Sequence, residues 1–422
     1  MSPDSFGSYV TSAMERTGHY PGYPSLSEIL HKSVINGRYG RTHKILRVDS
    51  KGTPKMLPKN ILPTVAALLA LSALPATAEL KYSNTTGGTV KLYGQFNPAY
   101  LSFDDGVASY GDLVDNEVSN TRAGLTVTQE FGASVLTFDF LTALGFGQSS
   151  NYSQTGNPEF LDWRRTFVRK LEFSLETPTA GKFSFGQGSM ATDGVAQSDL
   201  SGTKVAMYNG LDTVAGNYEI RTAAGALSGI EIDDSFTGFD SSRRGRLRYD
   251  SPSLNNFTFS AAYGKDILST NNNDTYIDAA VRYKNEIAGI KVVGSLGFAR
   301  RTRDAADRDD TFGSISGLHP SGFNLTLAAG SRKDSGKYSF AKVGYIADWV
   351  SVGKTSMAID FYNGSDFVTN GSSSRSIGLG IVQKFDAANL ETYLVVRSYE
   401  YTDPTTNYLD ASSALFGSRW KF

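Results

Sequence analysis

Hydrophobic residues recur at every second position in many stretches of this 422-residue chain. Between Arg122 and Phe131, apolar Leu125 and Val127 alternate with polar Thr126. The same alternation occurs at residues 90–100, 136–140, 167–175, 257–263 and 323–329. A strand turns successive side chains to opposite faces, and long runs with the helical period of 3.6 are missing from the sequence. The pattern predicts an all-β protein whose strands are apolar on one face and polar on the other.

The chain ends in mid-strand on an aromatic residue. Counted back in steps of two, Phe422, Trp420 and Phe416 share one face of a strand, while Lys421 and Arg419 share the other. A closed membrane barrel pairs its last strand with its first, which leaves no strand edge in lipid. The ending therefore favours a barrel over a soluble fold that trails off in a polar tail.

Composition agrees with a barrel and excludes other classes. A mean hydropathy of −0.26 with 20% charged residues excludes a helical membrane protein, whereas in a barrel only alternate residues meet lipid. The absence of cysteine excludes a disulfide framework and a thiolate metal site. Long polar segments such as 148–157 and 300–310 alternate with short ones such as 176–181. We predict a transmembrane antiparallel β-barrel of about 16 strands, each spanning the membrane with about 9–11 residues.

A soluble β-sandwich, or an adhesin that uses its long loops, would show the same alternation. Aromatic residues at the ends of the predicted strands, among them Trp163, Tyr249, Tyr345 and Trp420, are typical of membrane interfaces and favour the barrel. An outer-membrane or secreted β-rich adhesin without pore activity is the alternative interpretation.

Residues 56–78 have the three parts of a secretory signal peptide. A lysine near the front precedes an apolar run at residues 61–74, and Ala-Thr-Ala precedes Glu79. The run is interrupted by Pro63 and is shorter than the roughly 20 residues that a transmembrane helix needs. We therefore expect cleavage before Glu79.

Residues 1–55 differ in composition from the rest of the chain. They hold three of the four histidines and an excess of basic residues, which would also suit a nucleic-acid-binding or membrane-surface arm. Because signal peptides work at an N-terminus, we instead predict that translation begins at Met56 and that 1–55 is a disordered, non-native leader. Residues 79–422 would then be a single barrel domain, and no nucleic-acid partner is expected.

Several short patterns follow one another in order between Glu79 and Phe422. They are Leu92-Tyr93-Gly94-Gln95-Phe96, Ser119–Leu125, Phe185–Gly194, Asp199–Thr203, Arg248–Pro252 and the terminal Trp420-Lys421-Phe422. Together they resemble the general diffusion porins of Gram-negative outer membranes. The resemblance implies a 16-stranded barrel, usually a homotrimer, set in outer-membrane lipid and lipopolysaccharide. It also implies passive diffusion of small hydrophilic solutes and ions, with one loop folded into the lumen.

The resemblance places this constriction loop at about residues 186–216. Its glycines permit tight turns, and Asp193 and Asp199 supply negative charge. The acidic Pro-Glu-Phe-Gly-Gly pattern of enteric members is absent, so either aspartate is a candidate for the pore. A long extracellular loop with a solvated acidic face is the structural alternative.

Opposite such a loop the family carries basic side chains on the wall. By resemblance and by strand parity the candidates are Arg122, Arg164, Lys170, Arg244, Arg246 and Arg248. Cations facing carboxylates would set up a field across the lumen that orients dipolar solutes without binding them tightly. Arg165 and Arg169 have the parity of the outer face and would lie at a subunit contact.

Catalysis and cofactors find little support in the sequence. Residues 79–422 contain one histidine, His319, in a turn-like context, and no phosphate-binding loop, dinucleotide fingerprint or zinc spacing occurs. We expect no enzyme activity and no cofactor. A divalent cation at the acidic loop segments Asp104-Asp105 or Asp307–Asp310 is a secondary hypothesis beside solvated carboxylates.

Overall fold

The computed structural model describes residues 46–48, 54–56, 80–270, 272–303 and 306–422. The chain divides into two compact units, residues 1–67 and 68–422, each described by itself. In the first, β1 (Leu46–Val48) pairs antiparallel with β2 (Pro54–Met56). The predicted leader and signal peptide otherwise lie outside the described residues. Within the described part of the chain, no helix is both long and apolar enough to span a membrane.

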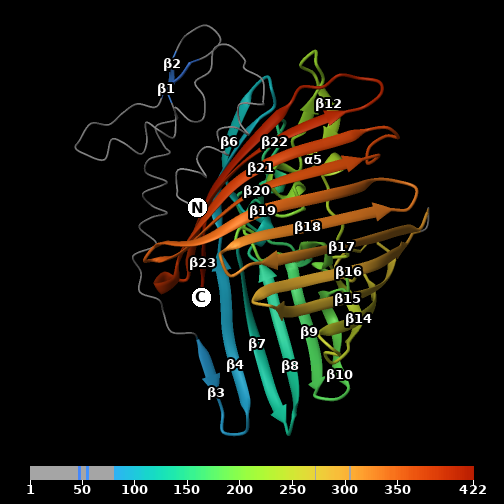
Figure 1. Ribbon diagram of the computed structural model, residues 1–422. Coiled ribbons are helices and arrows are strands. Elements are labelled where there is room, and N and C mark those ends of the chain that lie inside the picture. The colour runs from blue at the N-terminus through green and yellow to red at the C-terminus, as the bar shows by residue number, and fades with distance from the viewer. Residues whose placement is uncertain (1–45, 49–53, 57–79, 271, 304–305) are drawn as a thin grey trace. The chain divides into compact units, whose positions relative to one another are not determined.

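The second unit is a closed antiparallel β-barrel (Figure 1). Its strands are β3 (Lys81–Ser83), β4 (Gly88–Phe96), β5 (Pro98–Asp104), β6 (Ser109–Asp115), β7 (Arg122–Phe131), β8 (Ser134–Ala143), β9 (Val168–Thr177), β10 (Gly181–Ser189), β13 (Arg243–Asp250), β14 (Phe257–Lys265), β15 (Thr275–Ile287), β16 (Ile290–Thr302), β17 (Arg308–Leu318), β18 (Phe323–Arg332), β19 (Lys337–Val350), β20 (Gly353–Ser365), β21 (Ser373–Phe385), β22 (Leu390–Thr402) and β23 (Ala411–Lys421). A single residue, Asn97, separates β4 from β5, and a short helix, η2 (Glu117–Ser119), lies between β6 and β7. With β4–β5 and β6–β7 each taken as one interrupted strand, and the short β3 left aside, the barrel has 16 strands, as predicted.

The last strand closes the barrel, as the terminal aromatic predicted. β23 pairs with β22 on one side and with β5 and β4 on the other, where Trp420 lies opposite Phe96. Phe422 and Gly94 exchange backbone hydrogen bonds of 3.1 and 3.0 Å. The ring of Phe422 occupies the space beside Gly94 where a Cβ would lie, so a larger residue at position 94 would force this ring to move.

The alternating pattern turns the apolar face outward. On β18, Phe323 and Leu325 are about half exposed (51% and 48%), whereas the intervening Asn324 is buried. On β22, Leu394 faces outward and Tyr393 is buried inside. This inside-out distribution suits a barrel surrounded by lipid, because lipid solvates the outer apolar side chains.

Connections at the two ends of the barrel differ in length. At one end they are short, at residues 132–133, 178–180, 251–256, 288–289, 319–322, 351–352 and 386–389, the last including η6 (Asp386–Ala388). At the other end they are mostly longer, at 105–108, 144–167 (with η3, Ser149–Asn151, and η4, Arg165–Phe167), 190–242, 266–274, 303–307, 333–336, 366–372 and 403–410. Aromatic pairs such as Phe257–Tyr283 and Phe323–Tyr345 lie near the short turns, where an interfacial girdle is expected.

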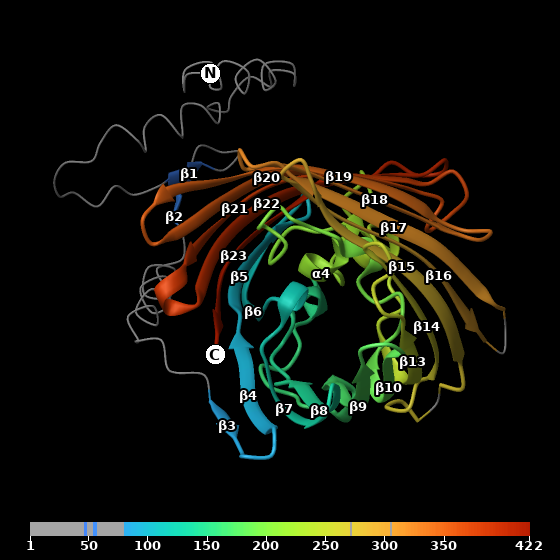
Figure 2. The same ribbon diagram turned by 60° about the horizontal axis from the view of Figure 1, so that its bottom comes forward.

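Much of the longest connection, residues 190–242, lies inside the barrel (Figure 2), and its hairpin meets the connection 403–410 at the end with the longer loops. It contains η5 (Val195–Gln197), α4 (Asp212–Ala215), β11 (Glu219–Arg221), β12 (Leu227–Glu231) and α5 (Ile232–Ser235). Figure 2 shows α4 within the ring of strands. Its bounds differ from the expected 186–216, because β10 continues to Ser189 and places Gly186 and Gly188 in the wall. The Gly-Gln-Gly-Ser sequence carries too few side chains to mark where the strand ends. We refer to residues 190–242 as the inner loop.

Candidate functional site

One carboxylate on the wall fastens both ends of the inner loop. Asp278, buried on the inward face of β15, accepts hydrogen bonds from the amides of Ala191 and Thr192 at 3.1 and 2.7 Å. It also accepts bonds from the Thr192 hydroxyl at 2.6 Å and the Ser241 hydroxyl at 2.8 Å. The loop therefore leaves and rejoins the wall at a single point.

Hydroxyl groups on β16 and β17 hold the next part of the inner loop. Ser314 Oγ donates to the carbonyl of Val195 at 2.5 Å and accepts from the amide of Ser198 at 2.8 Å. Ser316 Oγ accepts from the amide of Leu200 at 3.0 Å. These side chains lie at alternate inward positions, so the spacing of the wall matches the backbone of the loop.

A buried ion pair joins Asp199 to Lys342 of β19. Both side chains are almost fully buried, at 2% and 0% exposure, and Lys342 Nζ also donates to the carbonyl of Met207 at 2.8 Å. Asp199 was expected to be an acidic group of the pore. The structure places it instead between loop and wall, where Lys342 neutralises its charge. This pairing cannot be inferred from local pattern, because Lys342 lies 143 residues away from Asp199.

Tyr393 ties the two strand interruptions to the inner loop. Its hydroxyl donates to Asn97 Oδ1 at 2.7 Å and accepts from Asn116 Nδ2 at 2.8 Å. Asn116 Nδ2 also donates to the carbonyl of Val205 at 2.9 Å. Beyond this point, loop aromatics pack on the inner wall, with Phe236 against Tyr399 at a ring distance of 5.2 Å. The loop therefore covers the inside of β15–β22.

Basic side chains line a cavity of about 460 Å³ at the other side of the barrel interior. It is bordered by Arg122, Arg169, Lys170, Arg243 and Lys421, together with Tyr93, Gly94, Gln95, Leu141, Ser189 and Phe422. Asp193, near the start of the inner loop, lies with its Oδ2 3.7 Å from Arg243 Nη2. The loop thus brings one carboxylate to a cavity lined by five cations, which we call the basic cavity.

Two of the predicted wall residues line the basic cavity. Arg122 makes only long hydrogen bonds, from Nη2 to Ser119 Oγ at 3.4 Å and to Gln95 Oε1 at 3.5 Å. Lys170 Nζ lies 2.7 Å from Asp139 Oδ2. Both side chains therefore face inward, as the sequence predicted.

Arg169 lines the same cavity, although its parity predicted the outer face. The register shifts between β8 and β9, with Leu141 opposite Lys170 but Thr142 opposite Val168. Arg169 is the extra residue of this β-bulge, which re-aims a side chain that strict alternation would turn outward. The prediction for Arg169 was wrong because alternation cannot reveal a bulge.

The three predicted arginines of β13, Arg244, Arg246 and Arg248, lie on the inward side but do not border the basic cavity. Arg246 pairs with Glu172 and donates to the carbonyl of Ser189 at 3.0 Å. Arg248 Nη1 donates to the carbonyl of Met190 at 2.7 Å, and Arg244 lies over the ring of Tyr276 at 4.2 Å. Two of these arginines therefore hold the end of β10 and the start of the inner loop. Arg282, which the sequence did not single out, does the same by donating to the carbonyl of Ala191 at 2.6 Å.

Arg164 lies in a connection between strands and not in the barrel wall. It precedes η4 in the connection 144–167, its side chain is 69% exposed, and it pairs with Asp162. Strand β9 begins only at Val168, so the period of two cannot be extended back to Arg164. The assignment of Arg164 to the inner wall is therefore corrected.

Two partly buried carboxyl groups of the inner loop have a raised pKa. Asp240 accepts hydrogen bonds from the amides of Gly194 and Ser242 at 3.0 and 2.6 Å. Burial and then the neighbouring carboxylate of Asp193 raise the pKa of Asp240 to about 7. Burial likewise raises the pKa of Asp212 to about 7. Both groups are therefore partly protonated at neutral pH.

The acidic loop segments proposed as a cation site have other partners. Asp105 pairs with Arg221, Asp309 with Arg300, and Asp310 with both Arg308 and Arg332. Residues 304–305 are not described. Among the described residues, no group of three or more histidine, aspartate or glutamate side chains is placed to hold a metal ion.

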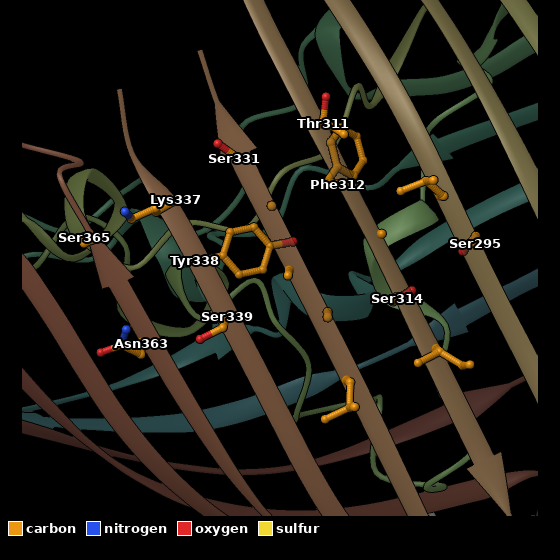
Figure 3. A pocket seen from close by; sticks show the side chains of 17 residues that line it. Ser295, Thr311, Phe312, Ser314, Ser331, Lys337, Tyr338, Ser339, Asn363 and Ser365 are labelled. Carbon is orange, nitrogen blue, oxygen red and sulfur yellow. The ribbon is translucent and has the colours of Figure 1, made fainter. Parts of the chain in front are cut away.

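A concave region of the outer surface lies over β16–β20, and Figure 3 shows the side chains that line it. Exposed Thr311, Ser331 and Ser339 border it, and small residues such as Gly313 and Ala329 form its floor. It is a shallow depression of the barrel exterior and is separate from the basic cavity.

Comparison with known proteins identifies the family. A model of the Gram-negative porin family matches residues 64–404. The fold is similar to that of the anion-selective porin from Comamonas acidovorans (15% identity, 79% of this chain and 100% of that chain, TM-score 0.53). It is also similar to OmpT, an outer membrane protein of Vibrio cholerae (14%, 82% and 100%, 0.53), and to OprB of Pseudomonas putida (8%, 79% and 94%, 0.51). A search of curated protein sequences found no match.

The family match covers most of the chain, and the closed barrel of 16 strands agrees with it. Family and fold point to a channel rather than an enzyme, and they do not favour the adhesin alternative. The chain belongs to the Gram-negative porin family, as an integral outer-membrane β-barrel that forms a channel for passive diffusion.

Proposed function

We propose that solutes cross the barrel between the inner loop and the part of the wall that borders the basic cavity. The observation that carries this proposal is the distribution of the loop contacts, which lie on β15–β22 and beside β5, where Tyr218 packs against Phe103 and Arg221 pairs with Asp105. Asp278, Ser314, Ser316 and Lys342 bind it to β15–β19, while Arg122 lines a cavity on the opposite side. Small hydrophilic solutes and ions pass through this constriction without energy input and without catalysis.

Charge is distributed unequally across the proposed path. Arg122, Arg169, Lys170 and Arg243 lie on the wall, and Asp193 lies on the loop. Such an arrangement produces a transverse field that orients dipolar solutes. Asp193 is thus the proposed pore carboxylate, whereas Asp199 serves to attach the loop.

We further propose that the outer face of the barrel contacts lipid and other copies of the chain. The exposed apolar residues of the outer face suit contact with outer-membrane lipid and lipopolysaccharide, and with other copies of the chain in a homotrimer. OmpT of Vibrio cholerae has been solved in a trimer form.

We also propose that residues 56–78 are removed and that 1–55 are not translated. Sequencing the N-terminus of protein extracted from outer membranes should give Glu79 first.

Cysteine accessibility can test the path, because the chain contains no cysteine. A bulky thiol reagent should lower the single-channel conductance of Ser189→Cys, since Ser189 borders the basic cavity. Ser331→Cys on the outer face of β18 is the matched control and should keep its conductance. The purified chain should first give reproducible conductance steps in planar bilayers. Absence of steps would support the adhesin alternative, and equal responses of the two variants would exclude the proposed path.

A further inference from the structure

We propose that Asn370 is a site of spontaneous deamidation, in which Asp366 accepts the proton released from the Gly371 nitrogen. The inference concerns the connection between β20 and β21 and is independent of the proposed solute path. In an Asn-Gly sequence the backbone nitrogen of the glycine can attack the side-chain carbonyl carbon of the asparagine. Exposure to water, a mobile side chain, a permissive backbone and a nearby base all favour this reaction.

Three Asn-Gly pairs occur within the described residues of the barrel unit, and their surroundings differ. Asn209 is 3% exposed, and its Nδ2 donates a hydrogen bond of 3.1 Å to a tyrosine hydroxyl. The pair that begins at Asn363 lies inside β20, whose backbone is paired with β19 on one side and with β21 on the other. The pair that begins at Asn370 lies in the connection 366–372, and both of its residues are exposed. Of the three, this pair alone combines access to water with a backbone outside the sheet.

The backbone of this connection holds the attacking nitrogen beside a carboxylate. Gly371 N donates to Asp366 Oδ1 at 2.8 Å. Two backbone hydrogen bonds close the turn around this contact, from Asp366 N to Ser372 O at 2.9 Å and from Ser372 N to Thr369 O at 3.0 Å. A carboxylate oxygen at hydrogen-bond distance is within reach of a proton that it can accept as a general base. The nucleophile of this pair therefore has a base on its own N–H bond.

Gly371 also gives the backbone the freedom that ring closure needs. Its φ is +85°, in the left-handed region, and glycine adopts φ values of either sign at little cost. A Cβ at this position would lie 3.0 Å from Cγ of Pro404, so a larger residue would crowd the turn. The side-chain amide of Asn370 forms no hydrogen bond with any described residue and can rotate toward the Gly371 nitrogen.

The reaction balances without an oxidant, a reductant or a cofactor. The Gly371 nitrogen bonds to Cγ of Asn370 while its proton passes to Asp366. The side-chain nitrogen of Asn370 takes up a proton and leaves as ammonia, so that a cyclic succinimide joins the two residues. Water then opens the ring at either carbonyl. The products are aspartate and isoaspartate, in which the chain continues through the former side chain.

Either product adds a carboxylate to the connection 366–372, beside that of Asp366. Isoaspartate also adds a carbon atom to the backbone between Thr369 and Ser372, whose hydrogen bond closes the turn. We therefore expect a slow, irreversible change that is confined to this connection.

Peptide mass spectrometry of the purified chain in detergent tests the site. After incubation at mildly alkaline pH, the peptide that contains Asn370 should gain the mass difference between an amide and a carboxylic acid. The peptides that contain Asn209 and Asn363 are internal controls and should keep their masses. A freshly purified sample, digested in parallel, corrects for deamidation during digestion. Electron-capture fragmentation should identify isoaspartate beside aspartate.

Replacement of the proposed base gives a second test. Asp366→Asn keeps the size of the side chain at a position with a φ of +61°, which asparagine tolerates. It should slow deamidation of Asn370 by about tenfold, less than the usual contribution of an enzymatic general base. Asp334→Asn is the matched control, because Asp334 has a φ of +59° in the separate connection 333–336. This variant should leave the rate at Asn370 unchanged.

The outcomes decide the site and the base separately. An unchanged mass at Asn370, or equal mass gains at Asn370 and Asn363, would overturn the proposed site. A rate in Asp366→Asn that equals or exceeds the wild-type rate would overturn the role of Asp366 as proton acceptor. Neither result bears on the solute path, which conductance measurements test.

Discussion

The two sides of the barrel interior use the same inward positions in different ways. On β19–β22, inward side chains are buried beneath the inner loop, and two buried cations are paired, Lys342 with Asp199 and Arg397 with Asp360. Around the basic cavity, Arg122 and Arg169 have no such partners within the described residues. A charge that is buried needs a partner of opposite sign, whereas a charge that faces a water-filled path is hydrated and remains available to a passing solute. The two buried pairs thus mark the side that holds the loop, and the two arginines without an ion pair mark the side proposed to conduct.

Breaking the buried pair on the covered side should have the largest effect. Lys342→Met leaves Asp199 buried without its cation, which costs about 3–5 kcal/mol. Thermal unfolding in detergent should therefore occur at a lower temperature than for Lys337→Met, an exposed position on the same strand. Adding Asp199→Leu to Lys342→Met should recover most of the loss. Equal unfolding temperatures for the two lysine variants would contradict the pairing argument.

A second prediction concerns the wall next to the basic cavity. Gly186 has a φ of +115° inside β10, and a Cβ there would collide with the carbonyl oxygen of Leu171. Gly186→Ala should cost about 1–3 kcal/mol in a denaturant titration. Gly317→Ala on β17 is the control, because nothing lies within 4 Å of the added Cβ. Similar unfolding midpoints for the two variants would show that strain at Gly186 has been overestimated.

Removal of one hydroxyl tests how the covered side is joined to the interrupted strands. Tyr393→Phe deletes the hydrogen bonds to Asn97 and Asn116 and should lower stability by about 1–2 kcal/mol. The outward-facing Tyr345→Phe should change it by less than half as much. Unfolding midpoints measured under identical detergent conditions provide the comparison. An unchanged midpoint for Tyr393→Phe would remove this contact from the account of loop attachment.

The smallest expected effect is a pH dependence of the inner loop. The pKa of Asp240 is raised to about 7, so the folded state holds a proton that the unfolded state loses near its ordinary value of 3.8. Stability from this group is complete below pH 3.8 and falls as pH rises toward 7. Asp212 contributes with the same sign. The unfolding temperature should therefore decline from pH 5 to 8, with a smaller slope in Asp240→Asn. A slope unchanged by this variant would contradict the assignment.

The sequence predicted those parts of the fold that depend on local pattern. Alternation identified the outward Phe323 and Leu325 and the inward Arg122, and the terminal Phe422 predicted the closure with the first strand. These predictions succeeded because a strand exposed to lipid on one face imposes its period directly on the chain.

Features that depend on distant partners could not be predicted in the same way. The burial of Asp199 between loop and wall depends on its pairing with Lys342, which is far away in sequence. The lumenal position of Arg169 depends on a register shift against Leu141 and Thr142 of the preceding strand. The end of the inner loop at Ser242 follows an inserted hairpin, β11–β12, that has no period of its own. Each case requires knowledge of pairing between strands, which a single sequence does not contain.

Because Asp278 bonds both the departing and the returning segment of the inner loop, one wall residue fixes the distance between the two ends of that loop. Between Thr192 and Ser241, a change of length is compatible with the strand register where it spares the contacts with Ser314, Ser316 and Lys342. The size and charge of the constriction can therefore differ between related chains while the barrel strands stay the same.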